Sequence, residues 1–241
     1  METKQLKPLG HKAYGSIPHL PGSRLGAGDH HCSEGQARIA TEKARDKHDT
    51  IIVQEKLDGS CCAVAKINGQ IIALGRAGYP AKSSEYPVHH HFANWVAENS
   101  GWFSNLLKEG ERAVGEYLAQ AVGTRYKLHH EPFVIFDIMR GKERATYEET
   151  FCRASWYMFT VPRLLRHGNP LSIEDAIKAI ATSGHGAIDP VEGAIWRVER
   201  NGKVDFLTKF VRHDKDDGKY FPEKNNGIIT WNEIVKNDDP F

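Results

Sequence analysis

Charged side chains stand at the ends of apolar stretches at several places in this chain. The first is QEKLDGS (54–60), which follows the apolar run TIIV and precedes CCAVAKI. Lysine and aspartate are seldom buried without a partner, so these residues face either water at a strand end or a site. Charged residues in similar apolar surroundings follow at Arg76, Glu116, Asp137, Glu192 and Lys209. Together they predict a polar cleft between sheets, in which the charges balance one another.

The chemistry that would use this set is nucleotidyl transfer. The nitrogen of Lys56 can attack the α-phosphorus of a nucleoside triphosphate and form a phosphoramidate. The nucleophile is the neutral amine, so burial or nearby cations have to lower its pKa. Lys209 and Arg76 would supply cations, which would also stabilise the charge that moves to the pyrophosphate leaving group. Carboxylates such as Glu192 and Glu116 suit Mg²⁺, which prefers oxygen ligands and keeps several waters.

Two Asn-Gly pairs predict the β-hairpins that would position these residues, because Asn-Gly is the strongest short hairpin signal. Asn68-Gly69 joins the strand-like runs 60–67 and 70–76. A two-residue turn would fold Arg76 back to within a few residues of Lys56.

The second hairpin is predicted within 191–212, around Asn201-Gly202. Counting away from a two-residue turn sets Ala194 opposite Lys209. Glu192 and Lys209 would then be diagonal neighbours on one face, within reach of long side chains. A β-bulge in either strand would shift this register.

The other patterns mix helices and strands. Helix-forming residues with apolar spacing predict helices at 34–48, 92–108 and 172–183, the last with an N-cap serine. Apolar runs predict strands at 112–120 and 132–140. We therefore expect an α+β protein of two antiparallel sheets flanked by helices.

The composition is that of an ordinary globular protein, with 40% hydrophobic and 26% charged residues among 241. A net charge of +1 neither requires nor excludes a nucleic-acid partner, which would bind a local patch. No apolar stretch is long enough to span a membrane, and the N-terminus lacks the apolar core of a secretory signal. Four cysteines are too few for a disulfide scaffold in this length and lack zinc-site spacing. A reduced, cytoplasmic protein is expected.

EKLDG (55–59) resembles motif I, KxDG, of the covalent nucleotidyltransferases, which include ATP-dependent RNA and DNA ligases and mRNA capping enzymes. Further segments resemble the later motifs in the family's order. They are LGRAG with Arg76 for motif Ia, VGEYLA with Glu116 for motif III, FVIFDI with Phe136 and Asp137 for motif IIIa, VEGAIWR with Glu192 for motif IV, and FLTKFVR with Lys209 for motif V. KxDG alone is a weak pattern, whereas six ordered segments over about 50–212 are specific. The likeness is closest to the RNA ligase 2-like and editing-ligase branch of the RNA ligases.

The resemblance implies a nucleotidyltransferase (adenylation) domain of the ATP-grasp-like, DNA ligase-like fold, with ATP and Mg²⁺ or Mn²⁺ as cofactors. It implies that AMP becomes covalently bound to Lys56, and that Glu192 and Glu116 serve the metal. The nucleotide contacts that it implies are Glu55 beside the adenine, Phe136 stacked on the base, Arg76 and Glu116 on the ribose, Lys209 on the α-phosphate, and Asp58 and Gly59 within the motif itself.

Two features depart from the family's pattern. Motif V of RNA ligases often has two lysines one residue apart, and here Leu207 stands at the earlier position while Arg212 follows. We expect residues 1–50 to form an arm and helix packed on the core and residues 51–241 to form the adenylation domain, with no OB-fold domain. A ligase of this length would then need an accessory protein or an oligomer, or would use its N-terminal arm on RNA.

RNA contacts are predicted from basic residues, with the alternative that these belong to a solvated loop. Tyrosines interleave with the cluster and are candidates for base stacking. The basic candidates are Arg112, Arg125, Lys127 and Arg212, with His129 and His130 beside them and Tyr117 and Tyr126 as the aromatics. The run His89–His91 is expected in a loop before a helix and not at a metal.

The function that the resemblance implies is ATP-dependent RNA ligation. AMP on Lys56 would pass to a 5′-phosphate, and a 3′-hydroxyl would then displace AMP and seal the strand. One alternative is a nucleotidyltransferase that adenylylates RNA ends without sealing them. Another is a non-catalytic nucleotide- or RNA-binding module of the same fold, whose activity would not depend on Lys56.

Overall fold

The computed structural model describes residues 6–235, and the chain forms two compact units. Each unit is assembled from three separate stretches of the sequence. The first unit takes the residues up to Gly15 together with Ser60–Tyr117 and Phe133–Val161, and the second takes Ser16–Gly59, Leu118–Pro132 and the residues from Pro162 onward. The chain therefore passes from one unit to the other inside QEKLDGS, between Gly59 and Ser60.

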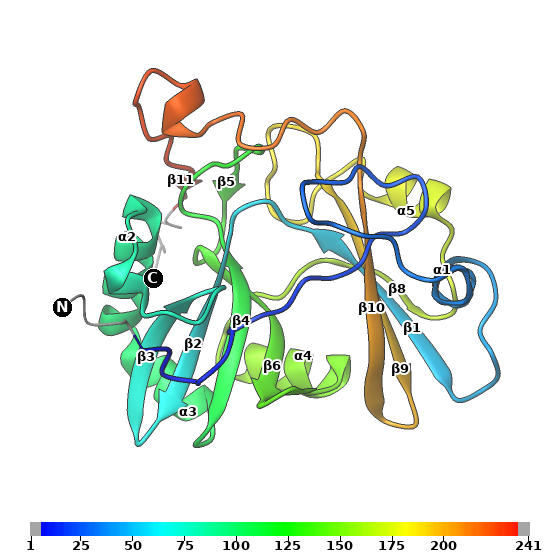
Figure 1. Ribbon diagram of the computed structural model, residues 1–241, viewed down its shortest axis with the longest axis horizontal. Coiled ribbons are helices and arrows are strands. Elements are labelled where there is room, and N and C mark those ends of the chain that lie inside the picture. Colours follow the sequence, from blue (N-terminus) through cyan, green and yellow to red (C-terminus); the bar gives the residue numbers. More distant parts are fainter. Residues whose placement is uncertain (1–5, 236–241) are drawn as a thin grey trace, which may run out of the picture. The chain divides into compact units, whose positions relative to one another are not determined.

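A four-stranded antiparallel sheet forms the centre of the second unit, in the order β10-β9-β1-β8 (Figure 1). Helices α1 and α5 contact this sheet, and their buried alanines share a core with Trp196 and Phe210. Trp196 is fully buried, and its indole N–H donates to the carbonyl of Leu171 at 2.9 Å. The elements are α1 (Glu34–Thr41), β1 (Asp49–Lys56), β8 (Leu164–Gly168), α5 (Ile173–Ala179), β9 (Gly193–Arg200), β10 (Lys203–Val211), the parallel pair β5 (Lys127–Leu128) and β11 (Glu233–Ile234), and a 3₁₀ turn at Pro222–Lys224.

The first unit is built on a five-stranded antiparallel sheet in the order β3-β2-β4-β6-β7. Aromatic side chains from its helices and strands pack together, with Phe92 4.9 Å from Tyr117 and 5.2 Å from Phe133 between ring centroids. The elements are β2 (Ser60–Ile67), β3 (Gln70–Gly75), a 3₁₀ turn at Ala81–Ser83, α2 (Pro87–Glu98), α3 (Ser100–Leu106), β4 (Glu111–Tyr117), β6 (Phe133–Arg140), β7 (Glu143–Arg144) and α4 (Tyr147–Trp156).

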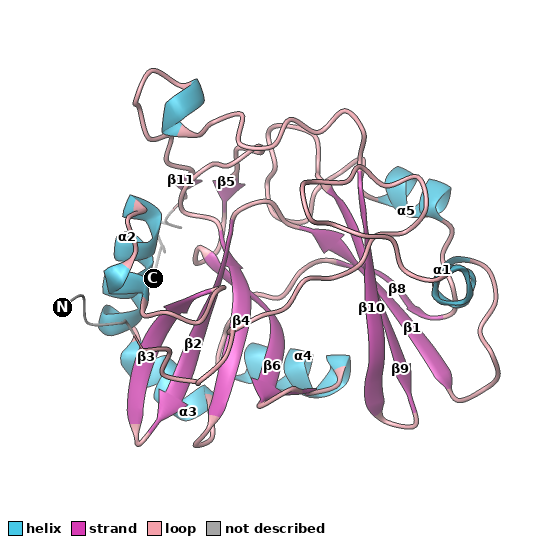
Figure 2. Cartoon of the chain, in the orientation of Figure 1, coloured by secondary structure: helices cyan, strands magenta, loops and turns pink. Residues whose placement is uncertain are grey.

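Both units combine helices with antiparallel strands (Figure 2), which confirms the α+β class. The strands on either side of QEKLDGS, β1 and β2, belong to different sheets. QEKLDGS is therefore the segment in which the chain passes from the second unit to the first, and it is not a β-turn. Among residues 6–235 there is no helix long and apolar enough to cross a membrane.

The first predicted hairpin has the expected register. Ile67 pairs with Gln70 across Asn68-Gly69, and the ladder continues to Cys62 and Gly75. Asn68 has a φ of 51° and Gly69 a φ of 72°, the left-handed conformations that a two-residue hairpin turn needs.

The second predicted hairpin begins as expected, with Arg200 opposite Lys203, and then shifts. An irregularity between Val204 and Phe206 moves the register by one residue, so Lys209 lies opposite Ile195 and not Ala194. The prediction that Lys209 and Glu192 are diagonal neighbours is therefore wrong. A one-residue bulge inverts the face to which each later side chain points, because side chains alternate along a strand.

The helices begin and end at residues other than those predicted from the sequence patterns. The capping box of Ser33 and Gln36 begins α1, but the helix ends at Thr41 and not near residue 48. The predicted helix 92–108 is two helices that meet at Asn99, and it begins earlier, at Pro87. His89–His91 consequently lie inside α2, because proline at the first helical position and the apolar face that follows extend the helix.

Candidate functional site

Lys56 is the last residue of β1, where it pairs with Gly193 at the start of β9. Its Nζ donates to an Oε of Glu192 at 2.6 Å and to the carbonyl of Leu57 at 3.3 Å. The side chain of Lys56 is 20% exposed and that of Glu192 is 9% exposed. The pair joins the lysine of the motif I segment to the glutamate of the motif IV segment, which lies 136 residues later in the sequence.

Glycine is required after Glu192, at the first residue of β9. A Cβ on residue 193 would lie 1.8 Å from the carbonyl oxygen of Phe210 in β10, so only glycine lets the two strands approach here. Glu192 is held immediately before it, and its carbonyl accepts the N–H of Arg212 at 3.0 Å. Burial raises the pKa of Glu192, while the Lys56 ammonium opposes that rise. Glu192 is thus a buried carboxylate compensated by the proposed nucleophile.

Glu55 is almost fully buried and has its carboxylate fixed from the loop after α5. Ser183 donates its hydroxyl to Glu55 at 2.6 Å, and the N–H of Gly184 donates at 2.8 Å. The next residue, His185, accepts the N–H of Arg163 at 3.0 Å, and burial lowers the pKa of His185 to about 3. A neutral imidazole therefore holds the loop that orients Glu55.

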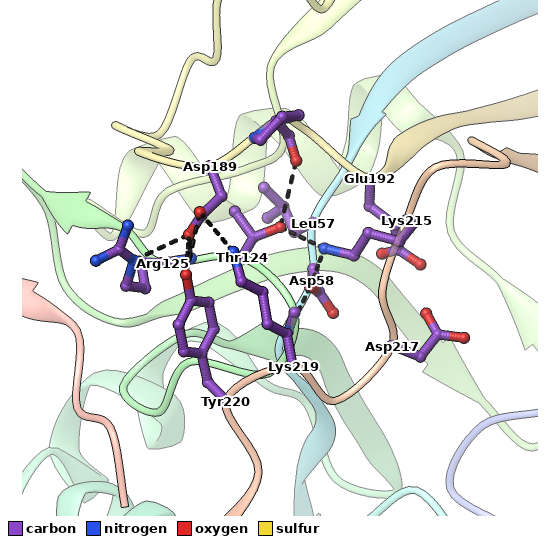
Figure 3. A network of polar contacts seen from close by, with 12 residues as sticks. Leu57, Asp58, Thr124, Arg125, Asp189, Glu192, Lys215, Asp217, Lys219 and Tyr220 are labelled. Carbon is purple, nitrogen blue, oxygen red and sulfur yellow. Dashed lines mark hydrogen bonds and ion pairs between the residues drawn. The ribbon is translucent and has the colours of Figure 1, made fainter. Parts of the chain in front are cut away.

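Asp58 lies in a dense polar network (Figure 3). Its carboxylate accepts the N–H of Gly123 at 2.8 Å and pairs with the ammonium of Lys215, which also donates to the hydroxyl of Thr124. The N–H of Asp58 donates to the hydroxyl of Tyr126 at 3.0 Å. Sequence reasoning missed Lys215, because RHDKDDGK is typical of a solvated charged loop.

A pocket of about 170 Å³ lies beside this network in the second unit. Its lining combines three cations and three carboxylates with Gly123, Pro190 and Val191. The charged lining residues are Arg212, Lys215 and Lys219 with Asp189, Asp214 and Asp216.

Lys209 lies at the edge of β10, where the N-terminal arm adds a strand-like segment. The carbonyl of Lys209 accepts the N–H of Leu20 at 2.8 Å, and its N–H donates to Pro18 at 3.0 Å. The ammonium of Lys209 lies 3.7 Å from Asp29, which also contacts His19 at 3.0 Å. The arm thus places a carboxylate against the lysine of motif V.

The first unit holds the remaining nucleotide candidates. Arg76 donates to the carbonyl of Gly15 at 3.2 Å, and Glu116 lies half-buried in β4. Phe136 contacts the ring of Tyr14 edge-on at 5.2 Å. The neighbouring Asp137 is fully buried and accepts hydrogen bonds from Tyr14 at 2.7 Å and Arg144 at 3.2 Å. Gly59, which completes motif I, belongs to the second unit and ends the first of its three stretches.

The residues predicted to contact RNA differ in how deeply their side chains are buried. Arg112 is 2% exposed and donates to the carbonyls of Ala13 and Gly141, so its guanidinium serves the interior of the first unit. Tyr117 and Tyr126 are also buried, which argues against base stacking on either ring. The other basic candidates form ion pairs near the surface: Arg125 with Asp189 at 3.0 Å, Lys127 with Glu233 at 3.2 Å, and Arg212 with Asp214.

No group of three or more His, Cys, Asp and Glu side chains that could hold a metal ion occurs in the described part of the chain. Mg²⁺ in nucleotide sites needs fewer protein ligands, typically one or two carboxylates with waters and substrate phosphates. The buried carboxylate of Glu192 is an oxygen donor of that kind, so the residues fit a divalent cation bound together with a nucleotide.

The sequence profile of the RNA ligase family matches residues 49–211. No curated protein matches the chain. Among solved structures, a variant of the Naegleria gruberi RNA ligase with AMP and Mn aligns with a TM-score of 0.52 at 15% identity, covering 90% of this chain and 64% of that one. This likeness shows the fold.

Two further structures align less closely. The Naegleria gruberi RNA ligase with pyrophosphate has a TM-score of 0.48 and 18% identity, covering 76% of this chain and 53% of that one. An archaeal ATP-dependent RNA ligase has a TM-score of 0.47 and 18% identity, covering 68% and 42%. The chain spans about half the length of these structures.

Proposed function

Because the chain belongs to the RNA ligase family, we propose that it is an ATP-dependent RNA ligase that acts through AMP bound covalently to Lys56. The observation that carries this proposal is the contact of 2.6 Å between Lys56 and the buried Glu192, at the strand end that carries EKLDG. An exposed lysine would be fully hydrated, whereas this one is held in place beside a buried carboxylate.

In the first step, Nζ of Lys56 attacks the α-phosphorus of ATP. A nitrogen–phosphorus bond forms, the bond from the α-phosphorus to the bridging oxygen breaks, and pyrophosphate leaves with that electron pair. The ammonium must first lose a proton, and Glu192 is in hydrogen-bond contact to accept it. The raised pKa of Glu192 favours this transfer, since a more basic carboxylate holds the proton more readily.

A divalent cation would fit the same site after Glu192 has passed that proton to solvent, because only the ionised carboxylate coordinates a cation. Glu192 is the residue of the second unit that would hold it. The cation would supply positive charge beside the phosphates when ATP is bound. Lys209 would contact the α-phosphate, and the fixed carboxylate of Glu55 would accept a hydrogen bond from the adenine amine. Asp58, Gly59, Arg76, Phe136 and the metal role of Glu116 stay predictions from the resemblance.

In the later steps, AMP passes from Lys56 to the 5′-phosphate of an RNA strand. A 3′-hydroxyl then attacks that phosphate, AMP leaves, and the strand is sealed. Arg125, Lys127 and Arg212 are the surface cations proposed to contact the RNA. All four cysteines are free thiols, which supports the proposed cytoplasmic location. The accessory protein or oligomer stays a prediction.

The proposal is tested by incubating the protein with Mg²⁺ or Mn²⁺ and ATP labelled at the α-phosphate, and then denaturing it. We expect acid-labile label on the wild-type protein, no label on Lys56→Ala, and no label from GTP. A folded wild-type protein, freed of bound AMP, that takes no label would contradict the proposal and favour a non-catalytic binding module.

A second candidate activity is adenylylation of RNA ends without sealing. The observation that favours it is Leu207, which stands where motif V often has a lysine and is 8% exposed in β10. A gel that resolves RNA products separates the two activities. Joined strands support the ligase, and accumulated strands capped with AMP support the second candidate.

A further inference from the structure

Lys215 is a buried lysine that the proposed chemistry leaves without a role. Its side chain is 5% exposed, and its ammonium pairs with Asp58, whose side chain is 9% exposed. Lys215 and Asp58 lie in the last and the first of the second unit's three stretches, and the aspartate stands two residues after the proposed nucleophile. Burial of a lysine is costly unless its charge is compensated, so Lys215 can be buried here only because Asp58 supplies the opposite charge.

Three segments converge at this ion pair. Thr124, which is fully buried, accepts a second hydrogen bond from the Lys215 ammonium. The N–H of Gly123 donates to the same Asp58 oxygen. A Cβ on residue 123 would lie 2.9 Å from both that oxygen and Cε of Lys215, so glycine is required for the close approach.

The main chain at residue 215 is held independently of its side chain. Its N–H donates to the carbonyl of Arg212 at 3.3 Å, and its carbonyl accepts a hydrogen bond from the guanidinium of Arg24. Lys215 is therefore a fixed cation and not a flexible surface side chain.

The position of Lys56 depends on the residues that this pair holds. Nζ of Lys56 donates to the carbonyl of Leu57, which lies between Lys56 and Asp58. Without the Lys215 charge, the buried Asp58 carboxylate would keep the Gly123 N–H but lose its cation, and the Leu57–Asp58 segment would relax toward solvent. The same uncompensated charge would repel an arriving triphosphate.

We propose that Lys215 is a positioning residue for the adenylylation of Lys56. Its ammonium neutralises Asp58 and fixes the Leu57–Asp58 segment, so that Lys56 stays directed at Glu192 and at the nucleotide. This inference rests on the proposed function, because it assigns Lys215 to the first step of that reaction.

The test measures single-turnover labelling by α-labelled ATP over a range of ATP concentrations. For Lys215→Met we expect the maximal rate to fall about 100-fold, since misplacement of a reacting group by about 1 Å has an effect of that size. The matched control is Lys224→Met, which removes a lysine of the same segment from an exposed pair with Asp216 at 2.9 Å. The control should label at the wild-type rate.

A bypass assay separates positioning from general damage. The same proteins are given RNA that already carries AMP on its 5′ end, so that sealing no longer requires adenylylation of Lys56. Lys215→Met should seal this substrate at a rate within a few-fold of wild type. Equal losses in both assays would show a merely structural role and would overturn the proposal, as would labelling at the wild-type rate.

The double variant Asp58→Asn/Lys215→Met covers the case in which Lys215→Met does not fold, because removing both charges avoids a buried unpaired carboxylate. If Lys215 acts through Asp58, the double variant should label no more slowly than Asp58→Asn alone. Additive losses would overturn the proposal. Absence of label on the wild-type protein would instead contradict the proposed function, so the two failures are distinguishable.

Discussion

A buried carboxylate lies at each end of β1, Asp49 at its start and Glu192 beside its last residue, and the charges around the two differ. At its start, Asp49 accepts hydrogen bonds from two arginines, Arg45 at 2.8 Å and Arg200 at 2.9 Å. At its far end, Lys56 meets Glu192. Burial alone would raise the pKa of Asp49, but the two guanidinium groups lower it to about 2. At Glu192 burial prevails and the pKa is raised.

The difference separates a stabilising ion cluster from the pair that we propose to be reactive. Asp49 accepts hydrogen bonds from two guanidinium groups, so it stays ionised and holds β1 to its neighbours. The ammonium groups of Lys56 and Lys215 only partly offset the burial of Glu192, which therefore resists ionisation. In the proposed mechanism, Lys56 and Glu192 exchange a proton. Perturbed carboxyl groups of the second kind are the ones associated with catalysis. The predictions below test whether the two ends are separable in this way.

The largest effect is expected from Glu192→Gln. We expect the rate of Lys56 labelling to fall about 100- to 1,000-fold, the usual cost of removing one electrostatic group from a reacting centre. The free energy of unfolding should not decrease at neutral pH, because an under-compensated buried carboxylate is removed. Quenched labelling and urea unfolding measure the two quantities. A rate near wild type would remove Glu192 from the mechanism.

Asp49→Asn should show the reverse pattern. The free energy of unfolding should fall by about 3 kcal/mol, because two guanidinium groups lose a buried anion. Labelling, measured at a temperature at which the variant is shown to be folded, should stay within a few-fold of wild type. If this variant lost labelling while keeping its stability, the comparison between the two ends would fail.

The pH dependence of stability should have opposite signs at the two ends. Asp49 has a pKa of about 2 in the folded protein, below its ordinary value of 3.8, so its contribution is complete above about pH 4 and is lost as the pH falls toward 2. Glu192 has a raised pKa, so its ionisation opposes folding at neutral pH and the cost disappears on acidification. Urea unfolding from pH 7 to pH 3 should therefore show both variants converging on wild type, Asp49→Asn from below and Glu192→Gln from above.

The smallest effect is expected from Asp205→Asn. Asp205 pairs with Arg45 at 2.6 Å, but both side chains are more than a third exposed. Exposed pairs contribute little, so the free energy of unfolding should change by less than about 0.5 kcal/mol. A loss comparable with that of Asp49→Asn would mean that the whole cluster, and not the buried carboxylate, carries the stability.

Local sequence signals predicted the elements and the first hairpin, whose register depends on residues adjacent to its turn. They did not predict the irregularity after Val204, because no glycine or proline marks it, and so Lys209 was placed opposite the wrong residue. They named Lys56 and Glu192 as candidates through the ordered motifs, and the structure brings these two side chains into contact.

Long-range partners were beyond the reach of the sequence. The pairing of Lys56 with Glu192 follows from the neighbouring positions of β1 and β9, which local patterns do not specify. Lys215 and Thr124 were missed for the same reason, since burial of a charged loop residue depends on segments far away in the chain. The resemblance to RNA ligases, by contrast, was confirmed because it rests on six ordered segments.

The interleaved assembly of the two units sets the order in which the protein can fold during synthesis. The sheet around Lys56 needs β1 from early in the chain and β9 and β10 from late in it. Asp49 must wait for Arg200 to leave the ribosome before their ladder can close, and contacts of such sequence separation form slowly. A chain released before residue 193 would leave β1 as an unpaired apolar edge on the side of β9, an aggregation hazard. The surroundings of Lys56 are thus completed late in synthesis, so a chain cut before residue 193 would lack the carboxylate of Glu192 that contacts Lys56.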